Sequence, residues 1–275
     1  MKLSLHSVIL GGNLSFEDQL KLAADLGYEG IDDGLGMAAQ IGAPALNEMC
    51  AKYNVYPACW GPSVEYRTDE AAFNEGMKAL PEQAKLAAGI NCPRACTWIP
   101  PAVDDDGQGT LKVWARRWGE IAKVLGDFGH RFGLEFVGPE HIRRGKSVTL
   151  YRMDQLLDLE SDIGEPNLGL LLDSFHWFNA GHTYDDLVKV PAEKIVHVHL
   201  NDAPDRPLSE QQDFERLAPG EGIIDLVGFL QALKDVGYDG YMGVEIFSQE
   251  LREMPPFDSA KRVKEGYDKL LAQVK

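Results

Sequence analysis

Short apolar runs alternate with longer amphipathic segments eight times along this sequence, and this alternation constrains the fold more than any other feature. Such a pattern is typical of βα units, whose strands pair in parallel. The expected strands are Leu3–Ile9, Gly30–Asp32, Val55–Trp60, Arg94–Ile99, Phe132–Val137, Leu168–Asp173, Ile195–Leu200 and Tyr241–Phe247. The expected helices are Ser15–Leu26, Pro44–Tyr53, Asp69–Ala88, Leu111–Phe128, Leu150–Ser161, Tyr184–Val190, Leu226–Val236 and Ser259–Val274.

The length of the chain suits eight βα units closed into one barrel. It has 275 residues, and a (β/α)8 TIM barrel needs roughly 250. No GxGxxG spacing follows an early strand, which disfavours a dinucleotide-binding doubly wound sheet. No linker or low-complexity tract interrupts the pattern. The sequence therefore predicts the α/β class and a single-domain TIM barrel over residues 1–275.

Charge and hydropathy restrict the partners. The formal net charge of −16 disfavours binding to a nucleic acid backbone. No apolar run approaches the roughly 20 residues of a membrane-spanning helix, and the first residues lack the apolar core of a secretory signal. We therefore expect a cytoplasmic protein with no nucleic acid or membrane partner. We expect reduced thiols rather than a disulfide framework or a zinc finger at Cys50, Cys59, Cys92 and Cys96.

The run Leu168–Asp173 is apolar until it ends on a carboxylate, and His176 follows three residues later. A continuous apolar run is typical of a strand buried on both faces. In a βα barrel, groups at the C-terminal ends of the strands form the active face. Taken alone, Asp173 is more simply explained as an ordinary loop-entry residue. The recurrence of the same arrangement in other strands favours a functional site.

Two glutamates stand inside apolar strands. Glu135 follows Gly133 by two residues, and Glu245 follows Gly243 in the same way. Since side chains alternate faces along a strand, we expect both carboxylates to point into the barrel, with the glycines leaving room. Ionised glutamates in such places are costly unless they are paired or bound to a cation. A structural ion pair is the simpler alternative, but these strands offer no Arg or Lys neighbour.

A histidine completes the proposed site. His197 and His199 share one face of their strand, and His199 is nearer the active face. Three carboxylates and one imidazole suit a divalent ion with positions left open for substrate. We predict one such ion, preferably Mn²⁺, with Co²⁺, Mg²⁺ or Zn²⁺ as alternatives, held by Glu135, Asp173, His199 and Glu245.

Five segments carry a resemblance to a known family: Leu134–Gly138, Leu172–His176, His199–Asp202, Pro219–Asp225 and Val244–Phe247. In these segments the chain resembles the xylose-isomerase-like TIM barrels, in particular the sugar isomerase/epimerase branch. Within that branch the chain resembles the inosose (2-keto-myo-inositol) isomerases. The resemblance is good from Glu135 to about Glu250, whereas the first half agrees only in its strand–helix pattern.

The resemblance implies roles for particular residues. It implies that Glu135 and Glu245 transfer protons as well as bind metal, and that His176 contacts a substrate oxygen. Ketose epimerases of the family carry an Arg six residues after the metal His and a second Glu six residues after the first. The nearest equivalents here, Arg206 and Glu140, stand seven and five residues away. Aromatic residues at or past strand ends are further candidates for substrate contact, or simple rim packing: Trp60, Trp98, Trp177 and Phe247.

The resemblance implies an isomerase or epimerase that moves a proton next to the carbonyl of a small polyhydroxylated keto compound, through an enediolate. The main alternative is a lyase that uses the same chemistry to expel a hydroxyl, as inosose and dehydroshikimate dehydratases do. A phosphodiesterase like endonuclease IV and a barrel that only binds a sugar are weaker alternatives. The long, Pro-rich segment Asp202–Gly222 is predicted to be a lid. Whether the chain forms a homo-oligomer stays open.

Overall fold

The computed structural model describes residues 1–12 and 14–275. Within these residues eight parallel strands form one sheet, in the order β3-β2-β1-β10-β9-β8-β6-β4. They are β1 (Lys2–His6), β2 (Gly30–Asp32), β3 (Tyr56–Pro57), β4 (Arg94–Trp98), β6 (Arg131–Glu135), β8 (Leu168–Asp173), β9 (Ile195–His199) and β10 (Tyr241–Gly243). Each overlaps a strand expected from the sequence.

The two ends of this order meet and close the barrel. Trp60, just past β3, forms a parallel bridge with Ala95 of β4. The N–H of Cys96 donates to the carbonyl of Trp60 at 2.9 Å, and the N–H of Trp60 donates to the carbonyl of Arg94 at 3.0 Å. Closure leaves no free edge at this junction, so the predicted TIM barrel is confirmed.

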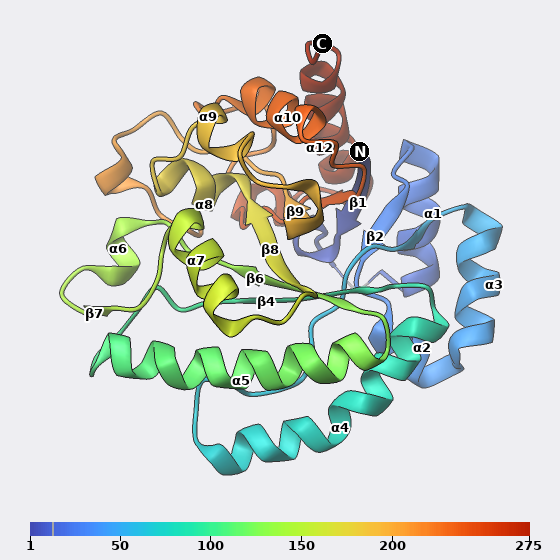
Figure 1. Cartoon of the computed structure of the whole chain (residues 1–275). Coiled ribbons are helices and arrows are strands. Elements are labelled where there is room, and N and C mark those ends of the chain that lie inside the picture. The colour runs from blue at the N-terminus through green and yellow to red at the C-terminus, as the bar shows by residue number, and fades with distance from the viewer. Residues whose placement is uncertain (13) are drawn as a thin grey trace.

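Helices cover the outside of the barrel, as Figure 1 shows for the long α4 and α5 along one side. The eight helices expected from the sequence appear as α1 (Phe16–Leu26), α3 (Ala43–Tyr53), α4 (Glu70–Gly89), α5 (Gly107–Asp127), α7 (Met153–Ile163), α9 (Tyr184–Leu187), α10 (Leu226–Asp235) and α12 (Pro256–Leu271). Local capping sets their ends. At α1, for example, the Ser15 hydroxyl accepts from the Asp18 N–H at 3.1 Å, and Gly27 ends the helix at φ 78°.

Several short elements were not expected from the sequence. Most of them follow the C-terminal ends of barrel strands and therefore build the rim of the barrel. They are α2 (Leu35–Ile41), α6 (Glu140–Arg143), α8 (Ser174–Asn179), α11 (Gln249–Glu253), the antiparallel pair β5 (Ala102–Val103) and β7 (Ser147–Val148), and the 3-10 turns η1 (Ser7–Ile9), η2 (Ala192–Lys194) and η3 (Leu208–Glu210). Elements this short carry too little periodicity to be predicted.

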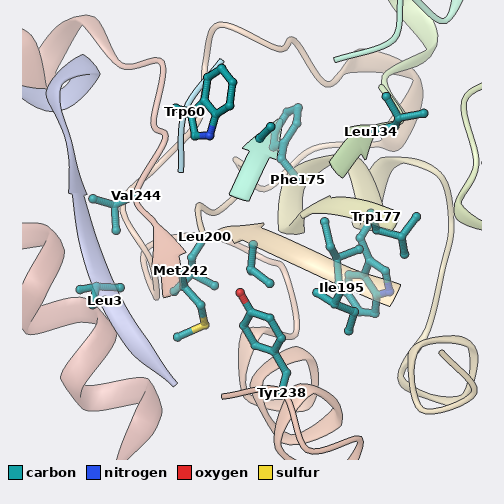
Figure 2. Close-up of a cluster of buried hydrophobic side chains, with 14 of the residues drawn as sticks. Leu3, Trp60, Leu134, Phe175, Trp177, Ile195, Leu200, Tyr238, Met242 and Val244 are labelled. Atoms are coloured by element: carbon teal, nitrogen blue, oxygen red, sulfur yellow. The ribbon is translucent and has the colours of Figure 1, made fainter. Parts of the chain in front are cut away.

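The hydrophobic core lies between the barrel strands and the helices. Figure 2 shows a part of it that includes Leu3, Tyr238, Met242 and Val244. Met242 and Val244 are fully buried in this layer. Because side chains alternate along an extended chain, Gly243 and Glu245 then face the interior of the barrel. Apolar packing outside thus fixes which polar groups point inward.

Candidate metal centre

The structure brings four distant residues to one end of the barrel. Glu135, Asp173 and His199 are the last residues of β6, β8 and β9, and Glu245 lies just past β10. Each offers one ligand atom, and these atoms all lie within 4.8 Å of one another. Parallel strands end on the same side of a barrel, which is why residues so far apart in sequence converge.

His199 lies between the two glutamates. Its Nδ1 is 3.5 Å from Oε1 of Glu135 and 3.4 Å from Oε2 of Glu245. Glu135 Oε1 and His199 Nδ1 are buried and make no hydrogen bond. Buried polar atoms without a partner are costly, so an atom or ion that binds both would stabilise this arrangement.

Asp173 is fixed by the strand-to-helix junction at which it lies. Its Oδ1 caps α8 by accepting from the backbone N–H of His176 at 3.0 Å. Its Oδ2 accepts from the side-chain amide of Asn201 at 2.8 Å. Ser174 holds Asn201 in turn, because its hydroxyl donates to the Asn201 carbonyl at 2.8 Å. These hydrogen bonds hold the Asp173 carboxylate in a fixed orientation. The sequence did not point to Asn201 or Ser174 as residues of the site.

The surroundings shift the pKa values of the two glutamates in opposite directions. Burial raises the pKa of Glu135, although the neighbouring His199 opposes this. Burial alone would also raise the pKa of Glu245, but the charges of His199 and Arg216 hold it well below its usual value. Two carboxyl groups with pKa values moved in opposite directions are typical of an acid–base pair.

Arg216 is the main residue that the sequence did not reveal. Its Nη1 lies 3.0 Å from Oδ2 of Asp173 and 3.1 Å from Oε2 of Glu245. Its Nη2 lies 2.9 Å from Oδ1 of Asp213. The expectation that no Arg or Lys pairs with the glutamates is therefore wrong for Glu245, because its basic neighbour comes from a loop and not from a strand.

The loop that carries Arg216 is tied to the end of β9. Asp202 and Leu217 exchange backbone hydrogen bonds of 2.9 Å in both directions. The Asp202 carboxylate accepts from the N–H groups of Gly220, Gly222 and Ile224 at 2.9–3.0 Å. This clasp brings Arg216 beside the strand end. Whether the rest of the segment acts as a lid stays a prediction.

The quartet fits a divalent cation in spite of Arg216. The three carboxylates of the quartet and that of Asp213 carry −4 and the guanidinium carries +1, which leaves a formal −3 with neutral histidines. A divalent ion would offset most of that charge. Carboxylate oxygens with one imidazole are ligands that Mn²⁺ and Zn²⁺ both accept.

Two cavities flank the glutamates. One of about 310 Å³ is bounded by His6, Asp32 and Trp60 among others. The other, about 420 Å³, is bounded by His176, Arg216 and Phe247 among others. Trp98, Glu135 and Glu245 line both. A small molecule in either cavity would therefore touch the two glutamates.

Some residues expected at the substrate site do line a cavity. Trp60 is buried on the side of the smaller cavity, where its ring also packs edge-on against His130 at 5.4 Å between centroids. His176 is buried on the side of the larger cavity, and its Nε2 lies 3.3 Å from Nη2 of Arg216. Both positions suit contact with substrate.

Three other expected residues do not line either cavity. Trp177 faces away from the site and packs on Phe229 of α10 at 5.2 Å, as its place in the core cluster of Figure 2 also shows. It lies one residue after His176 on α8, so it points to another side of the helix. Glu140 pairs with Arg144 at 3.4 Å at the surface. Arg206 pairs with Glu215 in the loop, and it is Arg216 that lines the larger cavity.

In the described residues, none of the helices combines the length and the apolar character that spanning a membrane requires. The four cysteines form no disulfide bond in the part of the chain that the structure describes.

Comparisons with known proteins agree with this architecture. The model of the family described as xylose isomerase-like TIM barrel matches residues 20–273. Among solved structures, a xylose isomerase domain protein from Alicyclobacillus acidocaldarius has a TM-score of 0.92 and 31% identity, over 99% of both chains. The structure of the IOLI protein, described as having a binding zinc atom, has a TM-score of 0.84 and 22% identity, over 100% of this chain and 99% of that one.

The matches to curated relatives cover a smaller share of the relatives' own length than the matches to these solved structures do. An inosose isomerase from Bacillus licheniformis is 32% identical over 147 residues, which are 53% of this chain and 50% of that protein. A 3-dehydroshikimate dehydratase from Pseudomonas putida is 27% identical over 270 residues, 94% of this chain and 40% of that protein. The chain thus spans about half or less of the length of these relatives. On the family model's match to residues 20–273, the chain belongs to the xylose isomerase-like TIM barrel family.

Proposed function

We propose that this chain is a metal-dependent enzyme that isomerises or epimerises a small polyhydroxylated keto compound, such as a keto-inositol or a ketose. One observation carries the proposal. Carboxylate oxygens of Glu135 and Glu245 lie 3.5 and 3.4 Å from Nδ1 of His199, and both glutamates line the two cavities. Relatives named inosose isomerase support the substrate class.

The cation would be held by Glu135, Asp173, His199 and Glu245. When bound, a divalent ion supplies positive charge that acidifies a C–H next to a carbonyl and stabilises the enediolate. We propose Mn²⁺, because three of the four ligands are carboxylates. Zn²⁺ is the ion to compare with it, because the IOLI structure is described as having a binding zinc atom.

The two glutamates would divide the proton transfer. Glu245, whose pKa is held well below its usual value, is ionised at neutral pH and can therefore accept a proton. Glu135, whose pKa is raised by burial, is better able to carry a proton and return it. Return to the neighbouring carbon gives isomerisation, and return to the opposite face of the same carbon gives epimerisation.

Two cationic or polar groups would hold the substrate oxygens in the larger cavity. Arg216 places a fixed positive charge beside both Glu245 and His176. Such a charge stabilises an oxyanion that develops during proton removal, and His176 beside it would contact the substrate from the same wall of the cavity. Trp98, which lines both cavities, offers an apolar wall for the carbon skeleton.

Dehydration is the second candidate. The match to the 3-dehydroshikimate dehydratase covers 94% of this chain, more than the match to the inosose isomerases does. A dehydratase would remove the same proton next to the carbonyl and then release the β-hydroxyl as water.

The charge of −16 disfavours a third candidate, hydrolysis of a nucleic acid phosphodiester.

A substrate panel in D₂O separates these reactions. Protein loaded with Mn²⁺ is incubated with keto-inositols, ketoses and 3-dehydroshikimate, and the products are followed by NMR and mass spectrometry. Deuterium beside the carbonyl, with no loss of water, supports isomerisation or epimerisation. Loss of water with new enone absorbance supports the dehydratase. Absence of exchange and turnover across the panel contradicts both proposals.

A further inference from the structure

A second group of side chains lies deeper in the barrel, and the proposed reaction does not use it. Asp32 ends β2, Cys59 follows β3, and His197 precedes His199 on β9. Together with His199, these residues offer ligand atoms that all lie within 4.8 Å of one another. Asp32 and both histidines are buried, and Cys59 is half-buried.

The separations between these atoms suit a tetrahedral ion. Oδ2 of Asp32 lies 3.3 Å from Nε2 of His197 and 3.9 Å from Nε2 of His199. Ligand bonds of about 2.0–2.3 Å in tetrahedral geometry separate neighbouring ligand atoms by about 3.3–3.8 Å. The Ser4 hydroxyl donates to Oδ1 of Asp32 at 2.7 Å, which leaves Oδ2 directed at the histidines. An outer hydrogen bond of this kind is usual for metal-binding carboxylates.

The surroundings provide both space and access. A Cβ at Gly243 would lie 1.7 Å from Oδ2 of Asp32 and 3.2 Å from Nε2 of His197. Only glycine at this position lets the carboxylate and the imidazole meet. The smaller cavity reaches Asp32, Cys59 and His199, so an ion has a route from the mouth of the barrel.

A structural ion pair between Asp32 and His197 explains only part of the cluster. It does not include the Cys59 thiol, and it leaves Nε2 of His199 at 3.9 Å from Asp32. A hydrogen bond with Cys96 and burial both raise the pKa of Cys59, so the thiol keeps its proton until a cation displaces it. Two imidazoles, a thiolate and one carboxylate are softer than the quartet, and they favour Zn²⁺ over Mn²⁺ or Mg²⁺.

We propose that Asp32, Cys59, His197 and Nε2 of His199 form a second cation site, specific for a zinc-class ion. His199 is shared between the two sites, because its Nδ1 faces Glu135 and Glu245 while its Nε2 faces Asp32. If both sites are filled, the ring must lose both of its N–H protons and bridge the ions. Occupancy of one site therefore changes the affinity of the other.

Cobalt(II) tests this proposal without any assay of activity. Metal-free protein is titrated with Co²⁺, and the near-ultraviolet absorption of a cobalt–thiolate bond is recorded. The quartet contains no sulfur, so the band reports the second site alone. The proposal expects a band that saturates within two equivalents, since the quartet also takes up Co²⁺, that disappears when Zn²⁺ is added, and that is absent from Cys59→Ser.

Cys96→Ser is the matched control, because Cys96 also lines the smaller cavity but is outside the cluster. It should keep the band. His197→Gln should weaken the band and lower the Zn²⁺ affinity at least tenfold, with an unchanged circular dichroism spectrum. A wild-type protein with no thiolate band, or a band that Cys59→Ser retains, overturns the proposal. Glu135→Gln should keep the band, so failure of the proposed reaction is distinguishable from failure of this site.

Discussion

Nη1 of Arg216 lies 3.0 Å from Oδ2 of Asp173, and both side chains are almost completely buried. The guanidinium also reaches Glu245 at 3.1 Å. A buried positive charge at this place compensates carboxylates that would otherwise repel one another. In the proposed mechanism the same charge stabilises the substrate oxyanion, so one residue serves both the stability of the site and its chemistry.

Substitution of Arg216 should therefore destabilise the metal-free protein. Removal of one partner from a buried charge pair costs about 3–5 kcal/mol. We expect Arg216→Met to lower the free energy of unfolding by about that amount in urea titrations. Arg206→Met is the control, because its pair with Glu215 is more exposed and should change stability by less than about 1 kcal/mol. Equal stability of the two variants would show that Arg216 is not needed to balance the carboxylates.

Gly243 should tolerate no side chain. An added Cβ would lie 1.7 Å from Oδ2 of Asp32, inside the barrel where neighbours cannot yield easily. We expect Gly243→Ala to cost about 1–3 kcal/mol or more from overpacking. Gly36→Ala is the control, since nothing lies within 4 Å of an added Cβ in α2. Thermal unfolding that leaves both variants at the wild-type Tm would contradict the packing described here.

Mn²⁺ should stabilise the folded protein. A ligand that binds only the folded state adds about 2.7 kcal/mol at a hundredfold excess over Kd. Glu135→Gln should lose most of this stabilisation, because it removes one of the proposed ligands. Glu140→Gln, on the nearby surface helix α6, should keep it. Urea unfolding with and without Mn²⁺ measures the difference, and an equal gain in both variants argues against Glu135 as a ligand.

His130 should make stability depend on pH. Its Nε2 lies 2.8 Å from the Ala84 carbonyl, and burial lowers its pKa from the ordinary value of 6.5. The unfolded chain then takes up the proton more readily than the folded protein does. The stability that neutral His130 provides is complete above pH 6.5 and is lost as the pH falls towards the lower folded-state pKa.

The variant His130→Asn lacks this titration. Its deficit in unfolding free energy relative to wild type should therefore shrink between pH 7.5 and pH 5.5, a range of about one unit on each side of the ordinary histidine pKa. If the free energies of unfolding of wild type and His130→Asn change in parallel over this range, His130 is not the source of the pH dependence.

The strand ends were predictable from sequence for a physical reason. A buried strand is recognisable by its apolar run, and a polar residue at its end must face either the interior or the rim. Asp173 and His199 follow this rule directly. Glu245 follows it through the alternation that also buries Met242 and Val244, and Glu135 through the alternation that buries Leu134 and Phe136. Local pattern was sufficient because the barrel itself determines which strand ends meet.

Loop residues could not be placed by the same reasoning. Counting forward from His199 led to Arg206, because that count assumes a short connection. The clasp between Asp202 and Leu217 instead brings a residue from the far end of the loop to the strand end. Arg216 directly precedes Leu217. The turn at Pro219 and Gly220 is therefore a better point in the sequence from which to locate this arginine.

Residues on short elements were misplaced or missed for related reasons. Trp177 was expected at the substrate site, but the helix α8 begins at Ser174 and turns this side chain towards Phe229. The cluster of Asp32 and Cys59 was missed because β2 and β3 are only three and two residues long. Such strands carry no alternation from which an inward-facing side chain can be inferred.

The central claim is that Glu135 and Glu245 transfer a proton between substrate and enzyme. Its most direct test is the rate at which solvent deuterium enters the carbon next to the carbonyl of a bound substrate, measured by NMR. Glu135→Gln and Glu245→Gln should each reduce this rate by at least about a hundredfold, the usual contribution of a general acid or base, while Glu140→Gln exchanges at the wild-type rate. Wild-type exchange in both Glu135→Gln and Glu245→Gln would contradict the account.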